Sequence, residues 1–196
     1  MAGEFTDWSE GAPLPPYDAL RKLLVVARPR TLLEVGCGAG IYRAVVRRCA
    51  PDVEYVGCDY SAAMVAHARG LYPGTRYDVA DQRQLPYQAG AFDLVLHGCC
   101  LIHLREPDAW AAALAEAARV ADRWVVLHRT PVRMLPGWRT LTKDVYGVEI
   151  RETHVPADAL PGLLAAAGLE SIGAVKWNEG QDPEQHSLLC RKQARA

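Results

Sequence analysis

The sequence lacks a long apolar run and an excess of charge of either sign. No stretch reaches the roughly 18 apolar residues of a membrane-spanning helix, and residues 1–9 lack the basic-then-apolar order of a signal peptide. With 22 Lys and Arg against 23 Asp and Glu, the formal net charge is -1. A general attraction to nucleic acids or anionic membranes is therefore not expected. We expect a cytoplasmic protein whose partner is a small molecule.

Cysteine is present but lacks the spacing of a metal site. None of the six cysteines forms a C-x2-C pair followed by a second such pair or by paired histidines, so no metal is expected. Most lie in apolar or glycine-rich runs, which favours buried free thiols in a reducing compartment. The neighbours Cys99 and Cys100 could form a reactive pair, but no flanking cation marks either sulfur for a lowered pKa.

The periodicity of the chain predicts one α/β domain over residues 1–196. Residues 1–30 comprise a glycine- and proline-rich arm and a helix over 17–27. Strands and helices then alternate, which predicts a doubly wound, mostly parallel sheet with helices on both faces. The expected strands are 31–35, 53–58, 75–79, 92–97 and 123–128, and the expected helices are 41–50, 61–70 and 107–120.

The alternation of strands and helices stops after the strand that ends near His128. Residues 130–154 show no clean period and are interpreted as an insertion on the side of a bound substrate. A helix over 157–167 follows, in which Pro161 marks either the true start or a kink. Strands near 169–177 and 185–192 are close enough to form an antiparallel pair.

The most informative segment is Glu34 to Gly40, Glu-Val-Gly-Cys-Gly-Ala-Gly, which directly follows an apolar run. It predicts a buried strand that breaks into a glycine turn, where backbone can approach a nucleotide-like ligand. A turn that only closes a strand-helix corner is the alternative. Asp59 ends the next strand, where a carboxylate can accept hydrogen bonds from a ribose diol, although it could also be a helix N-cap.

A third acid, Asp81, follows the third strand, with Gln82 beside it. Taken alone, an aspartate after a strand is usually turn chemistry. The carboxyl ends of parallel strands face one crevice, however, and an acceptor there could take the exocyclic amine of an adenine.

These residues, with Ala91 to His97 and Leu101 to Leu104, resemble the class I S-adenosylmethionine-dependent methyltransferases, in particular the small "type 11" group, from about Thr31 to His128. The resemblance implies a Rossmann-like, seven-stranded sheet with an antiparallel last strand and S-adenosylmethionine as the donor. It places Glu34 and the glycine loop under the methionine part, Asp59 at the ribose and Asp81 at the adenine. The donor-binding residues it implies are Glu34, Gly36, Cys37, Gly38, Gly40, Asp59, Tyr60, Asp81, Gln82 and His97.

The sequence lacks the motifs that are typical of other nucleotide-binding enzymes. No tyrosine is followed by a lysine four positions later, which speaks against a short-chain NAD(P)-dependent reductase, and no GxxxxGK[ST] element marks a P-loop. The fourth strand ends in His97-Gly98-Cys99-Cys100 rather than Asn/Asp-Pro-Pro-Tyr, which lowers the odds of a DNA base as acceptor. An inactive, donor-binding regulatory partner stays open.

An enzyme of this kind acts by in-line methyl transfer and yields S-adenosylhomocysteine. Oxygen acceptors need help in losing a proton, and histidines are available, so O-methylation is somewhat favoured. The candidate bases are His103, His128 and Tyr146. His97 and His154 are also expected near the crevice, and Glu152 lies with Tyr146 in the insertion. Trp138, Tyr146 and Val148 either wall an acceptor pocket or pack the insertion onto the core. Between Arg129 and Thr153 five basic residues face three acids, a hint of either an anionic acceptor or a solvated basic face.

Overall fold

The computed structural model describes residues 15–134, 136–145, 147–176 and 183–193. The helices are α1 (Pro15–Ala27), α2 (Ile41–Cys49), α3 (Ala62–Leu71), the 3-10 helix η2 (Leu101–His103), α4 (Pro107–Val120) and α5 (Leu160–Ala166). The strands are β1 (Thr31–Val35), β2 (Glu54–Asp59), β3 (Arg76–Val79), β4 (Phe92–Gly98), β5 (Ala121–Arg133), β6 (Arg139–Val145), β7 (Val148–Pro156), β8 (Leu169–Lys176) and β9 (Glu184–Lys192). None of these helices has the length and apolar character needed to cross a membrane.

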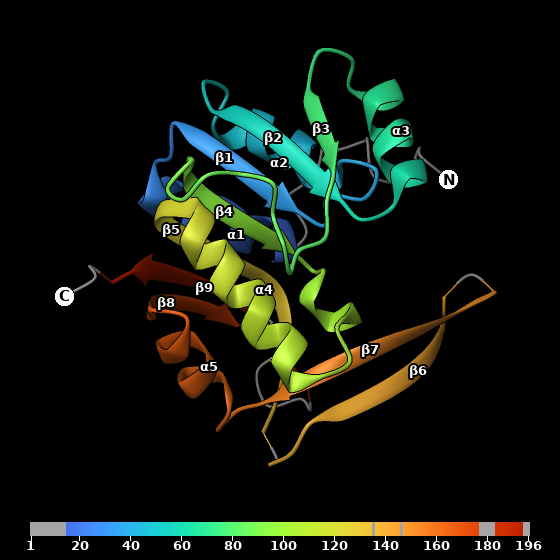
Figure 1. Ribbon diagram of the computed structural model, residues 1–196, viewed down its shortest axis with the longest axis vertical. Helices are drawn as coiled ribbons and strands as arrows, with labels where there is room; N and C mark the ends of the chain where they lie inside the picture. Colours follow the sequence, from blue (N-terminus) through green and yellow to red (C-terminus); the bar gives the residue numbers. More distant parts are fainter. Residues whose placement is uncertain (1–14, 135, 146, 177–182, 194–196) are drawn as a thin grey trace.

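The strands form one mixed sheet with a parallel centre (Figure 1). The order β3-β2-β1-β4-β5 is parallel throughout, and β9 lies antiparallel to β5 with β8 antiparallel to β9. The predicted doubly wound sheet and its antiparallel last strand are confirmed. Helices connect β1 to β2, β2 to β3 and β4 to β5, as the periodicity indicated, whereas no helix lies between β3 and β4.

The strand count exceeds the predicted seven, because residues 130–154 are not irregular. They continue β5 to Arg133 and then form the hairpin of β6 and β7, which projects from the body of the molecule (Figure 1). Gly147, with a φ of 80°, lies in the turn, and the hydroxyls of Thr140 and Thr153 meet across the strands at 3.1 Å. Most side chains of the hairpin that the structure describes are exposed or half-buried. The sequence therefore lacks the apolar alternation that would predict these two strands.

Two apolar clusters cover the two faces of the sheet. α1, α2 and α3 pack on one face, and α4 and α5 pack on the other. In α1, Leu20, Leu23 and Leu24 are buried while Val25 and Val26 are exposed, as the helical spacing of the apolar residues predicts. α5 begins at Leu160, with Pro161 in its first turn, because proline fits where no N–H donor is needed.

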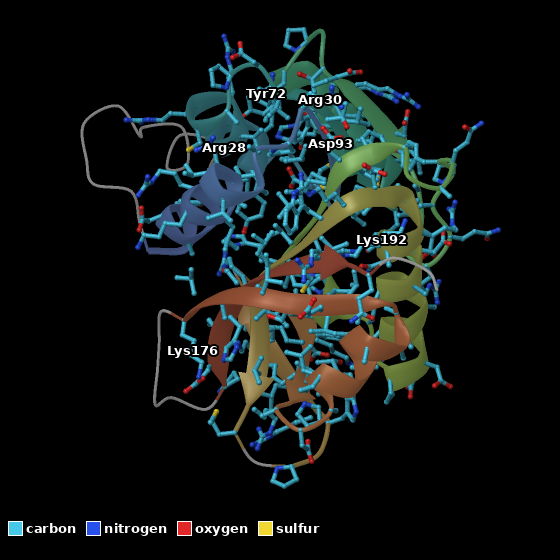
Figure 2. All side chains as sticks on the ribbon, turned by 90° about the vertical axis from the view of Figure 1, so that its left-hand side faces the viewer. Arg28, Arg30, Tyr72, Asp93, Lys176 and Lys192 are labelled. Carbon is cyan, nitrogen blue, oxygen red and sulfur yellow. The ribbon has the colours of Figure 1, made fainter. Side chains whose placement is uncertain are left out.

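Asp93 joins the amino ends of the neighbouring strands β1 and β4. Its carboxylate accepts the N–H groups of Arg30 and Thr31 at 2.7 and 3.2 Å, and its own N–H donates to the Thr31 hydroxyl at 2.8 Å (Figure 2). With the amino ends fixed in register, the carboxyl ends of the parallel strands meet at one edge. The glycine loop, Asp59, His97 and His128 all lie at that edge.

Candidate functional site

The three glycines that follow β1 adopt the left-handed backbone but have different surroundings. Their φ angles are 71° at Gly36, 51° at Gly38 and 84° at Gly40. A Cβ added to Gly36 would lie 2.2 Å from the Cβ of Cys100, and one added to Gly40 would lie 2.9 Å from the Tyr77 hydroxyl. At Gly38 the nearest atom is the Met64 methyl at 3.5 Å. The loop is therefore closed by packing at both ends and open at Gly38.

Asp59 joins the end of β2 to this open part of the loop. One carboxylate oxygen accepts the N–H of Gly38 and the other accepts the N–H of Ser61, both at 2.9 Å. Ser61, rather than Asp59, is the N-cap of α3, since its hydroxyl accepts the Met64 N–H. Asp59 is buried, whereas the adjacent Tyr60 is 81% exposed. Each carboxylate oxygen can accept a further hydrogen bond.

Glu34 is a fully buried carboxyl group on β1, directly before the loop. One oxygen accepts the hydroxyl of Tyr55 at 2.5 Å, and the other has no hydrogen-bond partner among the described residues. Burial raises the pKa of Glu34 to about 8, with the hydrogen bond from Tyr55 opposing and the charge of Asp59 adding to the shift. Near pH 7 this side chain is therefore mainly the neutral acid.

The raised pKa of Glu34 makes stability depend on pH, and Glu34→Gln should remove that dependence. Between about pH 4.5 and pH 8 the unfolded chain ionises this group while the folded chain keeps it protonated, so the free energy of unfolding falls as pH rises. The neutral variant should gain roughly 2 to 4 kcal/mol relative to the wild type between pH 5 and pH 8. Urea unfolding at both pH values measures this, and parallel curves for the two proteins would contradict it.

The end of β4 is held to the end of β1 by a thiol. The Cys100 sulfur lies 3.2 Å from Nδ1 of His97 and donates to the Val35 carbonyl at 3.1 Å. Burial lowers the pKa of His97 to about 4 and raises the pKa of Cys100 well above its usual value. The six cysteines are free, as predicted, and burial also raises the pKa of Cys99, which does not favour a reactive pair.

His128 ends the predicted part of β5 in a buried position. Its Nδ1 lies 2.9 Å from the Ser187 hydroxyl, and its ring meets the ring of Tyr42 edge-on at 4.9 Å. Burial, with a smaller effect of the Arg129 charge, lowers the pKa of His128 to about 3. The imidazole is therefore neutral at physiological pH, and its Nε2 has no hydrogen-bond partner among the described residues.

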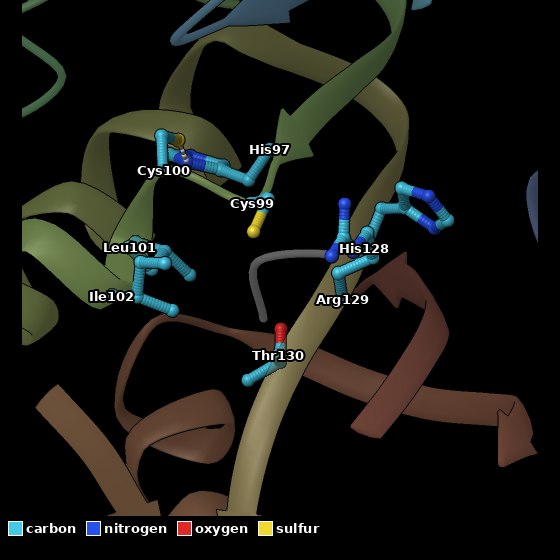
Figure 3. A pocket seen from close by; sticks show the side chains of 8 residues that line it. All are labelled: His97, Cys99, Cys100, Leu101, Ile102, His128, Arg129 and Thr130. Carbon is cyan, nitrogen blue, oxygen red and sulfur yellow. Dashed lines mark hydrogen bonds between the residues drawn. The ribbon is translucent and has the colours of Figure 1, made fainter. Parts of the chain in front are cut away.

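A shallow, narrow hollow lies where β4 and β5 end (Figure 3). Cys99 and Arg129 stand side by side there, with positive φ angles of 62° and 57°. The lining residues come from β4, the following η2 segment and β5: His97, Cys99, Cys100, Leu101, Ile102, His128, Arg129 and Thr130.

His103 and His154, both predicted near the acceptor, are not among the residues that line this hollow. His103 is exposed on η2, and Tyr146 lies outside the described residues. His154 is buried on β7, 3.6 Å from the carboxylate of Glu152. Trp138 packs its ring against Trp110 at 5.4 Å, which supports the packing alternative rather than a pocket wall.

Asp81 forms an ion pair with Arg83, which the sequence analysis did not predict. Arg83 donates to both of its carboxylate oxygens, with Nε at 3.0 and 3.1 Å, and these hydrogen bonds hold the pKa of Asp81 below its usual value. Both side chains are about half exposed. The spacing of two residues could have suggested this ion pair. Gln82 reaches the site instead, and its side-chain oxygen lies 3.4 Å from the Cys100 sulfur.

The site region also includes residues that were not predicted from the sequence, among them Tyr42, Ser187 and Gly98. Tyr42 and Ser187 pack against His128, and Gly98 leaves room for the Tyr42 ring, which would lie 2.7 Å from an added Cβ. Tyr42 and Ser187 lie far from His128 in sequence, so no local pattern links them. In the sequence, only Gly98 of the His-Gly-Cys-Cys segment indicated that another group packs closely against this strand.

Comparison with known proteins agrees with the fold and the loop. Residues 32–123 match the family described as a methyltransferase domain. Ajmaline N-methyltransferase from Rauvolfia serpentina is 27% identical over 175 residues, which cover 83% of this chain. The aligned part spans 60% of that relative's length.

Two solved structures show the same architecture. The PH0226 protein from Pyrococcus horikoshii OT3 superposes with a TM-score of 0.74 at 17% identity, covering 97% of this chain and 95% of that one. S-adenosylmethionine-bound CalS10, an amino pentose methyltransferase from Micromonospora echinaspora, gives 0.67 at 21% identity, covering 90% of each. The sheet order and the glycine loop agree with these similarities, which support a class I S-adenosylmethionine-dependent methyltransferase.

Proposed function

We propose that this chain transfers a methyl group from S-adenosylmethionine to a small-molecule acceptor, as one domain acting in the cytoplasm. The observation that carries the proposal is the meeting of Gly38 and Asp59. The open part of the glycine loop lies one hydrogen bond away from a buried carboxylate with unused acceptor capacity. The six free thiols favour the reducing compartment.

The residues present fit the donor that the family uses. The carboxylate of Asp59 would bind the ribose hydroxyls, and the exposed ring of Tyr60 offers a flat surface to the adenine. The buried, unpartnered oxygen of Glu34 and the loop at Gly36, Cys37, Gly38 and Gly40 would hold the methionine part.

Asp81 and Gln82 would face the adenine, with the exocyclic amine as the donor to the carboxylate. The pair of Asp81 with Arg83 is exposed, and such pairs contribute little free energy. Binding of the adenine would therefore displace Arg83 or share the carboxylate with it. His97 would lie beside the donor, as a neutral imidazole.

Bound S-adenosylmethionine supplies a methyl group that is already activated on a sulfonium, so the chain mainly aligns the acceptor and excludes water. Residues 1–30 and 130–154 are proposed to shape the acceptor side. Within the hollow, the neutral imidazoles of His97 and His128 and the protonated thiol of Cys100 provide polar groups without charge.

An oxygen acceptor is the finer part of the proposal, and it needs a base. Lowered pKa values make His97 and His128 weak bases, since a general base works best with a pKa near the operating pH. His103, exposed on η2, therefore stays the first candidate, ahead of Tyr146 and His128.

His103→Gln is expected to slow methylation of a phenol or alcohol by about 100-fold, in line with the contribution of a positioned base. Donor affinity should not change, because His103 lies outside the glycine loop and the end of β2. Initial rates of S-adenosylhomocysteine release and calorimetric donor binding measure the two effects. His67→Gln, at an exposed position on α3, is the matched control. Full activity of the His103 variant would remove that residue as the base.

The release of S-adenosylhomocysteine across a panel of amines, phenols, alcohols and carboxylates tests the proposed function itself. An enzyme releases it with at least one acceptor class. An inactive regulatory partner binds the donor but releases none with any acceptor. A reductase would instead gain thermal stability from NADH or NADPH.

A further inference from the structure

Two residues at the hollow have a left-handed backbone conformation, which residues other than glycine rarely adopt. Cys99 and Arg129 follow the paired residues Gly98 and His128 at the ends of β4 and β5, and the Cys99 N–H donates to the His128 carbonyl at 3.0 Å. A left-handed backbone strains such residues, because Cβ comes too close to the backbone. Such conformations gather at ligand sites, where the surrounding structure maintains them.

The backbone at Arg129 also breaks the regular pairing of β5 with β9. The register shifts between Leu127 and Thr130, and a bulge of this kind re-aims the side chain that it carries. The sulfur of Cys99, the guanidinium of Arg129 and the hydroxyl of Thr130 all lie at the hollow (Figure 3).

Arg129 gives the hollow its charge. Of the eight lining residues, His97 and His128 have lowered pKa values and Cys99 and Cys100 have raised ones, so all four are neutral near pH 7. Leu101, Ile102 and Thr130 do not ionise. Arg129, which is half-buried, is the one lining residue that is charged at this pH. A cation in a largely neutral, partly desolvated hollow favours an anionic ligand.

We infer that this hollow binds a carboxylate group of the methyl acceptor, with the guanidinium of Arg129 as its principal partner. A guanidinium presents paired donors that match the two oxygens of a carboxylate. Leu101 and Ile102, which are largely buried, line the hollow next to that group and would contact the hydrocarbon part of the acceptor. The inference rests on the proposed function, and it selects carboxylate-bearing acceptors from the small molecules that a methyltransferase could use.

The test is calorimetric binding to the protein saturated with S-adenosylhomocysteine. The probes are benzoate, 4-hydroxybenzoate and hexanoate, each paired with its amide. For the wild type, at least one carboxylate should bind ten-fold or more tightly than its amide. Arg129→Gln should abolish that preference, while Arg129→Lys, which keeps the charge but loses the paired donors, should retain part of it. Arg47→Gln removes an exposed charge from α2, away from the hollow, and should change nothing.

The inference is overturned if no carboxylate is preferred over its amide, or if the preference survives in Arg129→Gln. The affinity for S-adenosylhomocysteine, measured on the same samples, should stay within two-fold of wild type and shows that the variants are folded. Failure of the wild type to bind S-adenosylhomocysteine would instead contradict the proposed function, so the two failures are distinguishable.

Discussion

Asp59→Ala should weaken the binding of S-adenosylmethionine by ten-fold to 100-fold. The variant removes the acceptor proposed for the ribose hydroxyls, and hydrogen bonds to a charged group contribute about 1.5–3 kcal/mol each. It also releases the N–H groups of Gly38 and Ser61, so the glycine loop loses its tie to β2. Titration calorimetry with the donor and with S-adenosylhomocysteine measures the loss.

Two further variants separate ligand binding from loop support. Asp59→Asn keeps one oxygen acceptor and should fall between wild type and alanine. Asp52→Ala, at an exposed acid before β2, should bind the donor as wild type does. Unchanged affinity in Asp59→Ala would eliminate the ribose assignment.

Gly36→Ala should destabilise the fold by about 2–5 kcal/mol, because it adds overpacking to backbone strain. The new Cβ would lie 2.2 Å from the Cys100 Cβ, and the φ of 71° disfavours any side chain. For a chain of this size the melting temperature should fall by roughly 5–15 °C. Differential scanning calorimetry without ligand measures this effect.

Gly38→Ala is the matched variant, and we expect it to lower stability only slightly but to weaken donor binding. Its Cβ meets only the Met64 methyl at 3.5 Å, so stability should fall by only about 1–2 kcal/mol, the cost of the left-handed backbone. The added methyl occupies the open side of the loop, and donor affinity should fall at least ten-fold. Wild-type affinity in a folded Gly38→Ala protein would show that the donor does not approach there.

The parts of the fold that could be predicted are those set by local periodicity. In α1 and α4 the apolar residues lie three or four positions apart, and the buried parallel strands are short apolar runs. The meeting of Asp59 with the glycine loop was also predictable, because neighbouring parallel strands end at one edge.

The hairpin of β6 and β7 was not predictable from apolar periodicity. Many of its described residues, such as Lys143 and Arg151, are exposed, and the half-buried ones, such as Leu141 and Glu152, follow no apolar alternation. The hairpin depends on cross-strand pairs such as Lys143 with Glu152, and a pattern of apolar positions does not record such pairs.

The chemistry of the site depends on contacts between segments far apart in sequence. His128 and His97 were candidate bases because histidines titrate near neutral pH, but burial in the folded chain lowers both pKa values. The left-handed backbone of Arg129 follows from the bulge against β9, and no residue near Arg129 encodes it.

The most direct test of the central claim is titration of the wild-type protein with S-adenosylhomocysteine, with NADH and NADPH as comparisons. The claim is that the glycine loop and Asp59 form a site for the methyl donor. It predicts saturable binding with one site per chain and no heat with either nicotinamide nucleotide. Binding of NADH or NADPH without binding of S-adenosylhomocysteine would contradict it.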